Sequence, residues 1–355
     1  MLESIEIKNY KIIDSLKVEN LTNINVFVGK NNCGKTSLLE AIFLNFKPTD
    51  SRLIFRIVSM VIRRINPSND SLEWFFHKMD IQQSIEIMSL YEGKEMCLKI
   101  TPKLADNSVF KITENIDDKQ DFSSINIQKK ILGLDFTARF KGKAEVKCGF
   151  AIENKEEQQI IKSETIANYP SFSGLFVPSN NASLNVNLSY MVAELRKFKK
   201  EKDLNKYLGI FDEKILGAEL IGNEVMLDIT DMPKRVSINV MGEGFKKYFL
   251  IVSALILNKQ QHICIDEIEN GLHFESMKKL IEAIVEFCKE TNTQLFISTH
   301  SYEFLWFLSK IALEKDYKNA AVFNLANTKL KGLQTYRYDM EGVRSMIKNN
   351  TEFRD

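Results

Sequence analysis

The chain has 355 residues, 44% of them hydrophobic, which is enough to bury a large core and to hold one lobe with a second region inserted into it. Its 48 basic and 47 acidic residues give a net charge of +1. The protein as a whole therefore does not attract nucleic acid by its net charge, and only a local patch of basic residues could bind it. The five cysteines are scattered without a Cys-x-x-Cys pair, which indicates reduced thiols and a cytoplasmic location.

The N-terminal residues predict a strand rather than a targeting segment. Met1 to Ile7 alternate polar and apolar residues and lack the basic and then apolar order of a signal peptide. The longest apolar runs, such as Phe249 to Leu257, are too short to cross a bilayer. Leu53 to Ile65 combines apolar residues with arginines, and we interpret it as a buried helix with basic flanks rather than a membrane-surface helix. We therefore expect no membrane partner.

A phosphate-binding loop follows the apolar run from Ile24 to Val28 and precedes a helix that starts at Ser37. Its pattern is a glycine, four residues, and then Gly-Lys-Thr, which curls the backbone so that several N–H groups point at one anion. The start of the helix directs its partial positive charge at the same phosphates. We predict that ATP binds here, with Lys35 supplying a charge and Thr36 a hydroxyl for Mg²⁺. The predicted nucleotide-binding residues are Gly29, Asn31, Asn32, Gly34, Lys35, Thr36 and Ser37.

The middle of the chain carries less information about function. We expect an inserted α+β region over residues 49–173, with strands at Ile85 to Tyr91, Met96 to Ile100, Ala144 to Ile152 and Ile160 to Ile166, and a polar loop from Asp106 to Gln128. Gly174 to Pro178 is interpreted as a strand that re-enters the core. Asn187 to Leu208 reads as one helix with a basic cluster near its end, either a solvated face or a DNA-backbone contact.

The last third of the sequence contains a second group of residues that we expect to take part in catalysis. Strand-like Leu216 to Ile229 and Val236 to Val240 lead to a helix over Phe245 to Leu257. An apolar run then ends on Asp266 and Glu267, a helix covers about Phe274 to Lys289, and a buried strand from Gln294 ends on His300. This order is one βαβ unit, so both strand ends should face the phosphate loop. We predict that Asp266 holds Mg²⁺ and that Glu267 orients and polarises the attacking water. Terminal strands at Ala320 to Leu325 and Leu333 to Tyr338 and a closing helix from Met340 to Asn349 complete the chain.

With these parts in this order, the sequence resembles the ABC-type ATPases of the SMC, RecF and OLD group, and most closely the stand-alone OLD-like ATPases. The resemblance covers roughly residues 1–50 and 215–355. It implies an α/β fold, a P-loop ABC-type ATPase sandwich with a mixed sheet and flanking helices and an inserted α+β region. Residues 1–48 and 174–355 would form the ATPase domain, and residues 49–173 the compact insertion. No sustained heptads indicate a coiled-coil arm.

The resemblance also implies roles for residues that pattern alone does not decide. His300 would be the switch histidine that contacts the γ-phosphate, and the loop from Asn270 to His273 would cross to a partner subunit. Gly242 and Gly244 would bind the γ-phosphate held by the opposite subunit, although the serine usual in this segment is missing, so its contact is not carried over. Hydrolysis would then need a homodimer or larger assembly with two chains head to tail.

Absences narrow the function further. No Asn-Lys-x-Asp guanine-reading tetrad appears, which favours ATP over GTP, and the usual transporter signature is missing. We expect no Toprim nuclease domain after Arg337. The resemblance then implies a slow, assembly-dependent ATPase, a sensor or motor that controls a separately encoded effector, such as a Toprim-like nuclease, in bacterial defence against phage. The alternative is a nucleotide-gated DNA-binding clamp or scaffold in repair and recombination.

Overall fold

The computed structural model describes residues 1–46, 72–104, 131–155, 158–165, 174–179, 184–258 and 261–349. The strands are β1 Leu2–Tyr10, β2 Ile13–Val18, β3 Ile24–Gly29, β4 Ile85–Tyr91, β5 Lys94–Leu104, β6 Ile131–Phe140, β7 Val146–Lys155, β8 Gln158–Thr165, β9 Gly174–Val177, β10 Ile215–Ile221, β11 Glu224–Ile229, β12 Val236–Ser237, β13 His262–Ile265, β14 Gln294–Ser298, β15 Ala320–Thr328 and β16 Gly332–Tyr338. The helices are α1 Lys35–Phe46, α3 Leu184–Lys197, α4 Glu201–Phe211, α5 Glu243–Leu257, α6 Phe274–Glu290, α7 Tyr302–Glu314 and α8 Met340–Lys348.

A six-stranded sheet in the order β16-β15-β3-β14-β13-β9 lies in the interior of the molecule, with a hydrophobic core on each of its faces. Strands β15, β3, β14, β13 and β9 run parallel to one another, and β16 pairs antiparallel with β15 at one edge. The predicted βαβ unit is confirmed, because β13, α6 and β14 follow one another and the two strands pair in parallel. The carboxyl ends of β3, β13 and β14 therefore lie next to one another.

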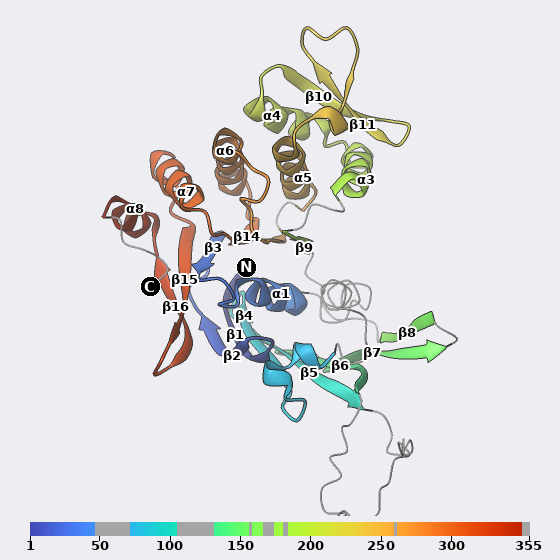
Figure 1. Ribbon diagram of the computed structural model, residues 1–355, viewed down its shortest axis with the longest axis vertical. Coiled ribbons are helices and arrows are strands. Elements are labelled where there is room, and N and C mark those ends of the chain that lie inside the picture. The colour runs from blue at the N-terminus through green and yellow to red at the C-terminus, as the bar shows by residue number, and fades with distance from the viewer. Residues whose placement is uncertain are drawn as a thin grey trace, which may run out of the picture.

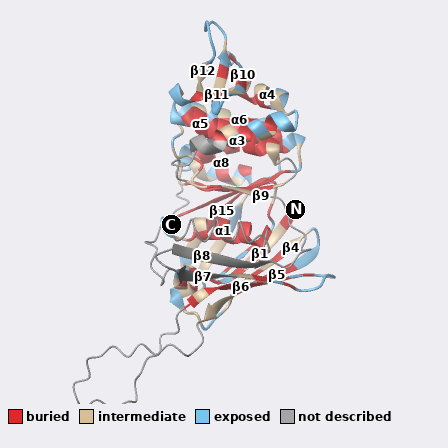
Figure 2. Ribbon diagram, turned by 90° about the vertical axis from the view of Figure 1, so that its right-hand side faces the viewer, coloured by how far each residue is buried: buried red, intermediate tan, exposed pale blue. Residues whose placement is uncertain are grey.

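The central strands β3, β13 and β14 are buried on both faces, as continuous apolar runs in a parallel sheet require. On β3, Val26 belongs to the core formed with helices α5, α6 and α7, whereas its neighbour Phe27 belongs to a second core formed with α1. Phe296 on β14 alternates in the same way with Ile297. Helix α1 thus lies between two sheets, and the layer that contains α5, α6 and α7 covers the opposite face of the six-stranded sheet (Figures 1 and 2).

The second sheet has seven antiparallel strands in the order β2-β1-β4-β5-β6-β7-β8. The strands anticipated from the middle of the chain are present, and they continue the sheet that β1 and β2 begin, because β4 pairs directly with β1. Strand β6 was not anticipated. The division of the chain at residues 48 and 173 stays a prediction, and the anticipated polar loop over 106–128 lies outside the described residues.

The expectation of one helix over Asn187 to Leu208 is wrong. The structure forms α3 and α4, which are separated at Phe198 to Lys200. Lys199 has a φ of 55°, and the N–H of Lys200 donates to the carbonyl of Leu195 at 2.8 Å, a helix-ending turn that the local sequence does not announce with a glycine. Beyond it, β10, β11 and β12 form a small three-stranded sheet.

Among the described residues, every helix is too short or too polar to span a bilayer. The segment from Leu53 to Ile65, interpreted above as a buried helix, lies outside the described residues.

Candidate nucleotide-binding site

The loop between β3 and α1 has backbone angles that only glycine adopts easily. Gly29 has a φ of 145°, and a side-chain carbon there would lie 2.5 Å from the carbonyl oxygen of Leu325 on the neighbouring strand. Gly34 has a φ of 101°, and a side-chain carbon would meet Ile12 at 3.2 Å. The two glycines at the ends of the motif are therefore required by the tight turn and by close approach.

Lys35 is the first residue of α1, and only 6% of its surface is exposed. Its Nζ donates to the carbonyls of Gly29 and Lys30, both at 3.0 Å, so the ammonium is held over the loop that it closes. Burial lowers the pKa of Lys35, and the nearby Cys33 thiol and acidic side chains oppose that shift in part. A buried ammonium inside a ring of backbone groups suits an anionic ligand.

Thr36 and Asp266 meet across the two strand ends. The Thr36 hydroxyl lies 3.1 and 3.2 Å from the two carboxylate oxygens of Asp266, and the Ser298 hydroxyl donates to Asp266 Oδ1 at 2.7 Å. Asp266 is 1% exposed. A hydroxyl and a carboxylate side by side are a donor set that Mg²⁺ accepts when phosphates and water supply the rest of its octahedron. The pairing of Thr36 with Asp266 thus fits the metal role predicted for both.

Glu267 lies at the mouth of the same strand end in a strained backbone conformation. Its φ is 47°, which is uncommon for a residue with a side chain and occurs most often at functional sites. Its N–H donates to the Ser298 hydroxyl at 2.8 Å, and its carboxylate accepts from the Asn270 amide at 2.6 Å. Backbone and side chain are therefore both fixed, and the carboxylate faces the phosphate loop.

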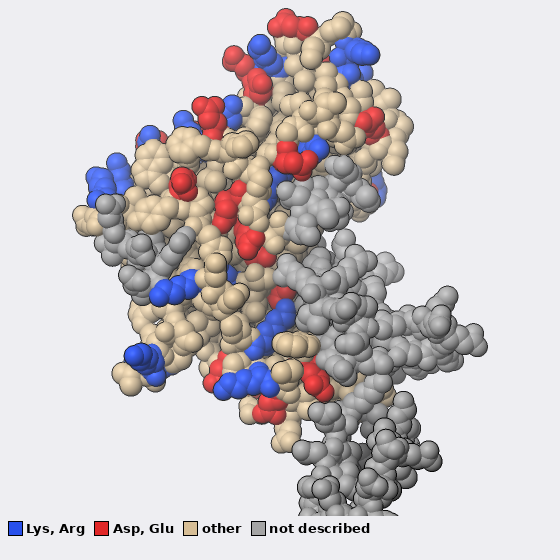
Figure 3. All heavy atoms as spheres, viewed as in Figure 1, with Lys and Arg blue, Asp and Glu red and all other residues tan. Residues whose placement is uncertain are grey.

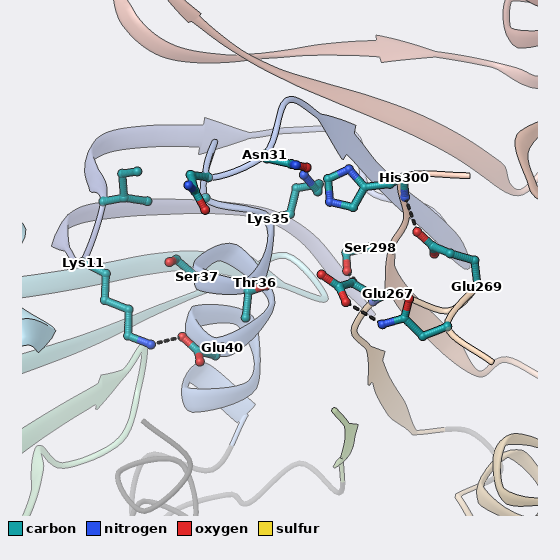
Figure 4. A pocket seen from close by; sticks show the side chains of 14 residues that line it. Lys11, Asn31, Lys35, Thr36, Ser37, Glu40, Glu267, Glu269, Ser298 and His300 are labelled. Carbon is teal, nitrogen blue, oxygen red and sulfur yellow. Dashed lines mark hydrogen bonds and ion pairs between the residues drawn. The ribbon is translucent and has the colours of Figure 1, made fainter. Parts of the chain in front are cut away.

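His300 follows β14 and is held in place by its backbone. Its N–H donates to Glu269 Oε1 at 2.5 Å, and the Thr299 hydroxyl donates to the other oxygen of the same carboxylate at 2.7 Å. Glu269 therefore ties the loop after β13 to the loop after β14. Figure 4 shows the His300 ring on the same side as Asn31 and Lys35, turned toward the loop.

These groups surround a cavity of about 910 Å³. The predicted residues that line it are Asn31, Asn32, Gly34, Lys35, Thr36, Ser37, Glu267 and His300. Gly29 and Asp266 lie behind this lining, where Gly29 shapes the turn and Asp266 bonds to Thr36. Acidic side chains gather near the middle of this face, between α6 and α1, with basic side chains beneath them (Figure 3).

Gly242 and Gly244 do not line the cavity of their own chain. Gly242 is the exposed residue that starts α5, no side chain caps that helix end, and a side-chain carbon there would meet no atom within 4 Å. Gly244 is buried, and a side-chain carbon there would lie 3.0 Å from the Gly271 carbonyl oxygen. Within one chain Gly244 is explained by close approach to that loop, and its predicted role toward a partner stays a prediction.

Sequence reasoning missed several residues of the site. Lys11, in the turn between β1 and β2, lines the cavity and forms an ion pair with Glu40 of α1. Lys247, in the second turn of helix α5, donates to the carbonyl of Glu267 at 2.9 Å. Glu269 clamps the His300 loop. The sequence signals are weak: Lys247 lies at the start of an apolar run, and Glu269 is an acid two residues after Glu267. Neither signal specifies the partner of the side chain.

The comparison with protein families decides the classification. Residues 24–305 match the family described as "AAA domain, putative AbiEii toxin, Type IV TA system", and this match contains the phosphate loop, both acids and His300. The chain belongs to this AAA domain family. The AAA domain assignment agrees with the geometry of the loop between β3 and α1, and the chain is a P-loop ATPase.

Two curated relatives extend along most of the chain. It is 27% identical over 339 residues to a Helicobacter pylori protein named "ATP/GTP phosphatase", which covers 89% of this chain and 90% of that protein. It is 22% identical over 275 residues to the "DNA replication and repair protein RecF" of Clostridium tetani, with 72% of this chain and 60% of that protein covered.

Among solved structures, the chain is similar to an SMC head bound to the C-terminal winged-helix domain of ScpA. The TM-score is 0.53 at 12% identity, and 96% of this chain and 98% of the other are covered. At this identity the likeness concerns the fold alone, and it confirms the predicted α/β architecture of mixed sheets with flanking helices. The assignment of this AAA domain protein to the stand-alone OLD-like branch stays a prediction.

Proposed function

We propose that this ATPase depends on Mg²⁺ and hydrolyses ATP in a site that a second copy completes, head to tail. The observation that carries the proposal is the arrangement of the two helix starts. The start of α1, with Lys35 and Thr36, lines the cavity, whereas Gly242, the N-cap residue of α5, does not line it and is exposed. One chain therefore supplies one side of a phosphate site and presents a second helix start that another chain can use.

The metal would be held by Thr36 and Asp266, whose oxygens already lie side by side. In the described parts of the chain, no group of three or more His, Cys, Asp and Glu side chains could hold a metal by itself. This suits Mg²⁺, which is usually bound through one or two protein oxygens together with substrate phosphates and water. The ion would neutralise charge that develops on the phosphates during transfer.

Glu267 would act as the base that orients the attacking water. Its carboxylate faces the cavity, and its backbone and the Asn270 bond keep it from rotating away. His300 would contact the γ-phosphate, because its ring lines the same cavity. Because positioning and electrostatic stabilisation are the main sources of rate in phosphoryl transfer, fixing these groups is the chief task of the protein.

We further propose that ATP turnover controls a separate effector protein, such as a nuclease of the Toprim type, in defence against phage. This part is supported by the resemblance to stand-alone OLD-like ATPases. An effector that binds only one assembly state of the ATPase would respond to an ATP-driven change of assembly. Co-purification of the tagged chain from its native host, with and without ATP, tests it. A protein that binds only in one nucleotide state supports the proposal, and the same set of proteins in both states counts against it.

The test of the enzymatic proposal compares wild type with Glu267→Gln in Mg²⁺ with ATP, and with GTP in parallel because of the name of the Helicobacter pylori relative. We expect wild type to hydrolyse ATP and the variant to bind it without turnover and to accumulate as a dimer or larger species in light scattering. If Glu267→Gln hydrolyses ATP at the wild-type rate, Glu267 is not the base. If the protein hydrolyses ATP while it stays monomeric, the site is not shared between two chains.

A DNA clamp is the second candidate function, favoured by the likeness to RecF and by exposed basic side chains around the α3 to α4 connection. Of these, Lys197 pairs with Glu194 at 3.2 Å and Lys200 with Asp203 at 3.7 Å, while Arg196, Lys199 and Lys202 are exposed. Exposed cations that release counterions from phosphates make affinity fall with salt. Salt-dependent DNA binding that strengthens with ATP, in the absence of any other protein, would favour the clamp.

A further inference from the structure

Lys247 is a buried cation in helix α5, directly after Lys246, which pairs with Glu243, and directly before the apolar remainder of the helix. It is 1% exposed, and its neighbours Tyr248 and Phe249 belong to the main core. A lysine in such a place is expensive, because its charge leaves water for an apolar surrounding. Burial lowers its pKa to about 8, although the Glu269, Glu267 and Asp266 carboxylates favour the charged form. The position therefore costs stability, which calls for a compensating role.

The lysine contacts one atom of the candidate active site. Its Nζ lies 2.9 Å from the carbonyl oxygen of Glu267, the residue with a φ of 47°. The same carbonyl also accepts the backbone N–H of Asn270 at 3.1 Å. The carbonyl would thus keep a donor without the lysine, so the need to satisfy a buried acceptor does not by itself explain why Lys247 is there.

Two contacts join the first two turns of α5 to the loop that carries Glu267. Gly244 packs so closely against Gly271 that a side-chain carbon would lie 3.0 Å from its carbonyl oxygen. Three residues later, nearly one turn along the helix, Lys247 donates to the carbonyl of Glu267. On the other side, Ser298 accepts the N–H of Glu267. The strained peptide is therefore fastened from β14 on one side and from α5 on the other, and Asn270 holds its side chain.

We propose that Lys247 is a positioning residue for Glu267, which transmits the position of the start of α5 to the carboxylate that orients the attacking water. This rests on the proposed role of Glu267 as base. In the composite site, the start of α5 faces the nucleotide of the other chain, so Lys247 mechanically links the arrival of that nucleotide to the base of its own chain. A displacement of the carboxylate by one ångström is enough to lower turnover on the order of 100-fold.

The test uses Lys247→Met, which keeps the length of the side chain and removes the cation and its hydrogen bond. Lys279→Met is the matched control, because Lys279 likewise donates from a helix to a backbone carbonyl, that of Phe211, far from the cavity. For each full-length protein we would measure turnover, affinity for a fluorescent ATP analogue in Mg²⁺, and the urea midpoint of unfolding. Lys247→Gln, which retains N–H donors without charge, completes the set.

We expect Lys247→Met to lose turnover by 10-fold to 100-fold, with analogue affinity within about twofold of wild type and a urea midpoint that does not fall. Lys247→Gln should recover part of the turnover, and Lys279→Met should leave it unchanged. In the Glu267→Gln background, Lys247→Met should have no further effect on turnover or assembly, because the group that it positions is already disabled.

Normal turnover in Lys247→Met would overturn the proposal. So would a fall in affinity as large as the fall in turnover, or a variant that does not fold, since either outcome makes Lys247 a structural residue. If wild type itself shows no turnover, or Glu267→Gln turns over normally, the assignment of the base fails first. That result is distinguishable from failure of the link through Lys247, which requires an active wild type and an inactive Glu267→Gln.

Discussion

The buried cation of Lys247 should give the protein a specific dependence of stability on pH. Its pKa is about 8 in the folded protein, against 10.5 for an ordinary lysine side chain. A group whose folded-state pKa is lowered binds fewer protons folded than unfolded between these two values. In that window the free energy of unfolding rises with pH. Below about pH 8 the full cost of the buried charge is present, and above about pH 10.5 it is gone.

The size of the effect follows from the shift. One unit of pKa corresponds to about 1.4 kcal/mol, so the whole shift amounts to about 3 kcal/mol. Between about pH 7 and pH 9.5 the part released is about 2 kcal/mol. In the unfolded chain other groups titrate in the same range, among them Tyr248 and Cys264, whose pKa burial raises in the folded protein. These groups are identical in Lys247→Met, so their contributions cancel in the difference between the two proteins.

The assay is urea denaturation of both proteins without nucleotide at about pH 7 and pH 9.5, followed by far-ultraviolet circular dichroism. We expect wild type to gain about 2 kcal/mol relative to Lys247→Met on going to the higher pH. An unchanged difference, or a loss by wild type, would show that the lysine is not a buried cation in solution and would refute the reasoning.

Two more predictions concern the phosphate loop. Lys35→Ala should abolish binding of the fluorescent ATP analogue while the circular dichroism spectrum stays that of wild type, because the ammonium is the charge that the loop presents to phosphates; retained binding would contradict this. Gly29→Ala should lower the free energy of unfolding by about 3 kcal/mol in urea, since its φ of 145° and the Leu325 carbonyl at 2.5 Å both exclude a side chain. A loss below about 1 kcal/mol would show that the loop relaxes.

The elements around the site could be predicted because their signals are local. Glycine spacing fixes the phosphate loop, and apolar runs that end on acids or on a histidine fix β13 and β14. Strand β6 was missed although its signal is present, since Leu134, Phe136 and Ala138 alternate with polar residues and are buried. The break between α3 and α4 was missed for another reason, because it relies on a left-handed lysine rather than on a glycine.

The contacts that fix the site could not be predicted from pattern. Lys247 and Glu269 read in sequence as ordinary charged residues beside apolar runs. Their roles come from packing: α5 crosses behind the strand end so that Lys247 reaches the Glu267 carbonyl, and β13 and β14 pair so that Glu269 reaches the Thr299 and His300 loop. Long-range placement of this kind depends on tertiary structure, which a single sequence does not display.

A complementation experiment tests the composite site most directly. Gly242→Trp should fold normally, because its φ is −61° and a side chain there meets open space, while it blocks the helix start that a partner needs. Glu267→Gln disables the base on the other half of the site. Each variant alone should be inactive in ATP hydrolysis, for different reasons.

When the two are mixed in equal amounts, half of the dimers contain both chains, and each of these has one site with an intact base and an intact helix start. Turnover should return to about a quarter of the wild-type level. Mixing Glu267→Gln with Lys35→Ala places both defects in the same half of the site and should restore nothing. Recovery in the first mixture but not the second is the result expected for two chains arranged head to tail. Activity that merely equals the sum of the two inactive parents in both mixtures would contradict a shared site.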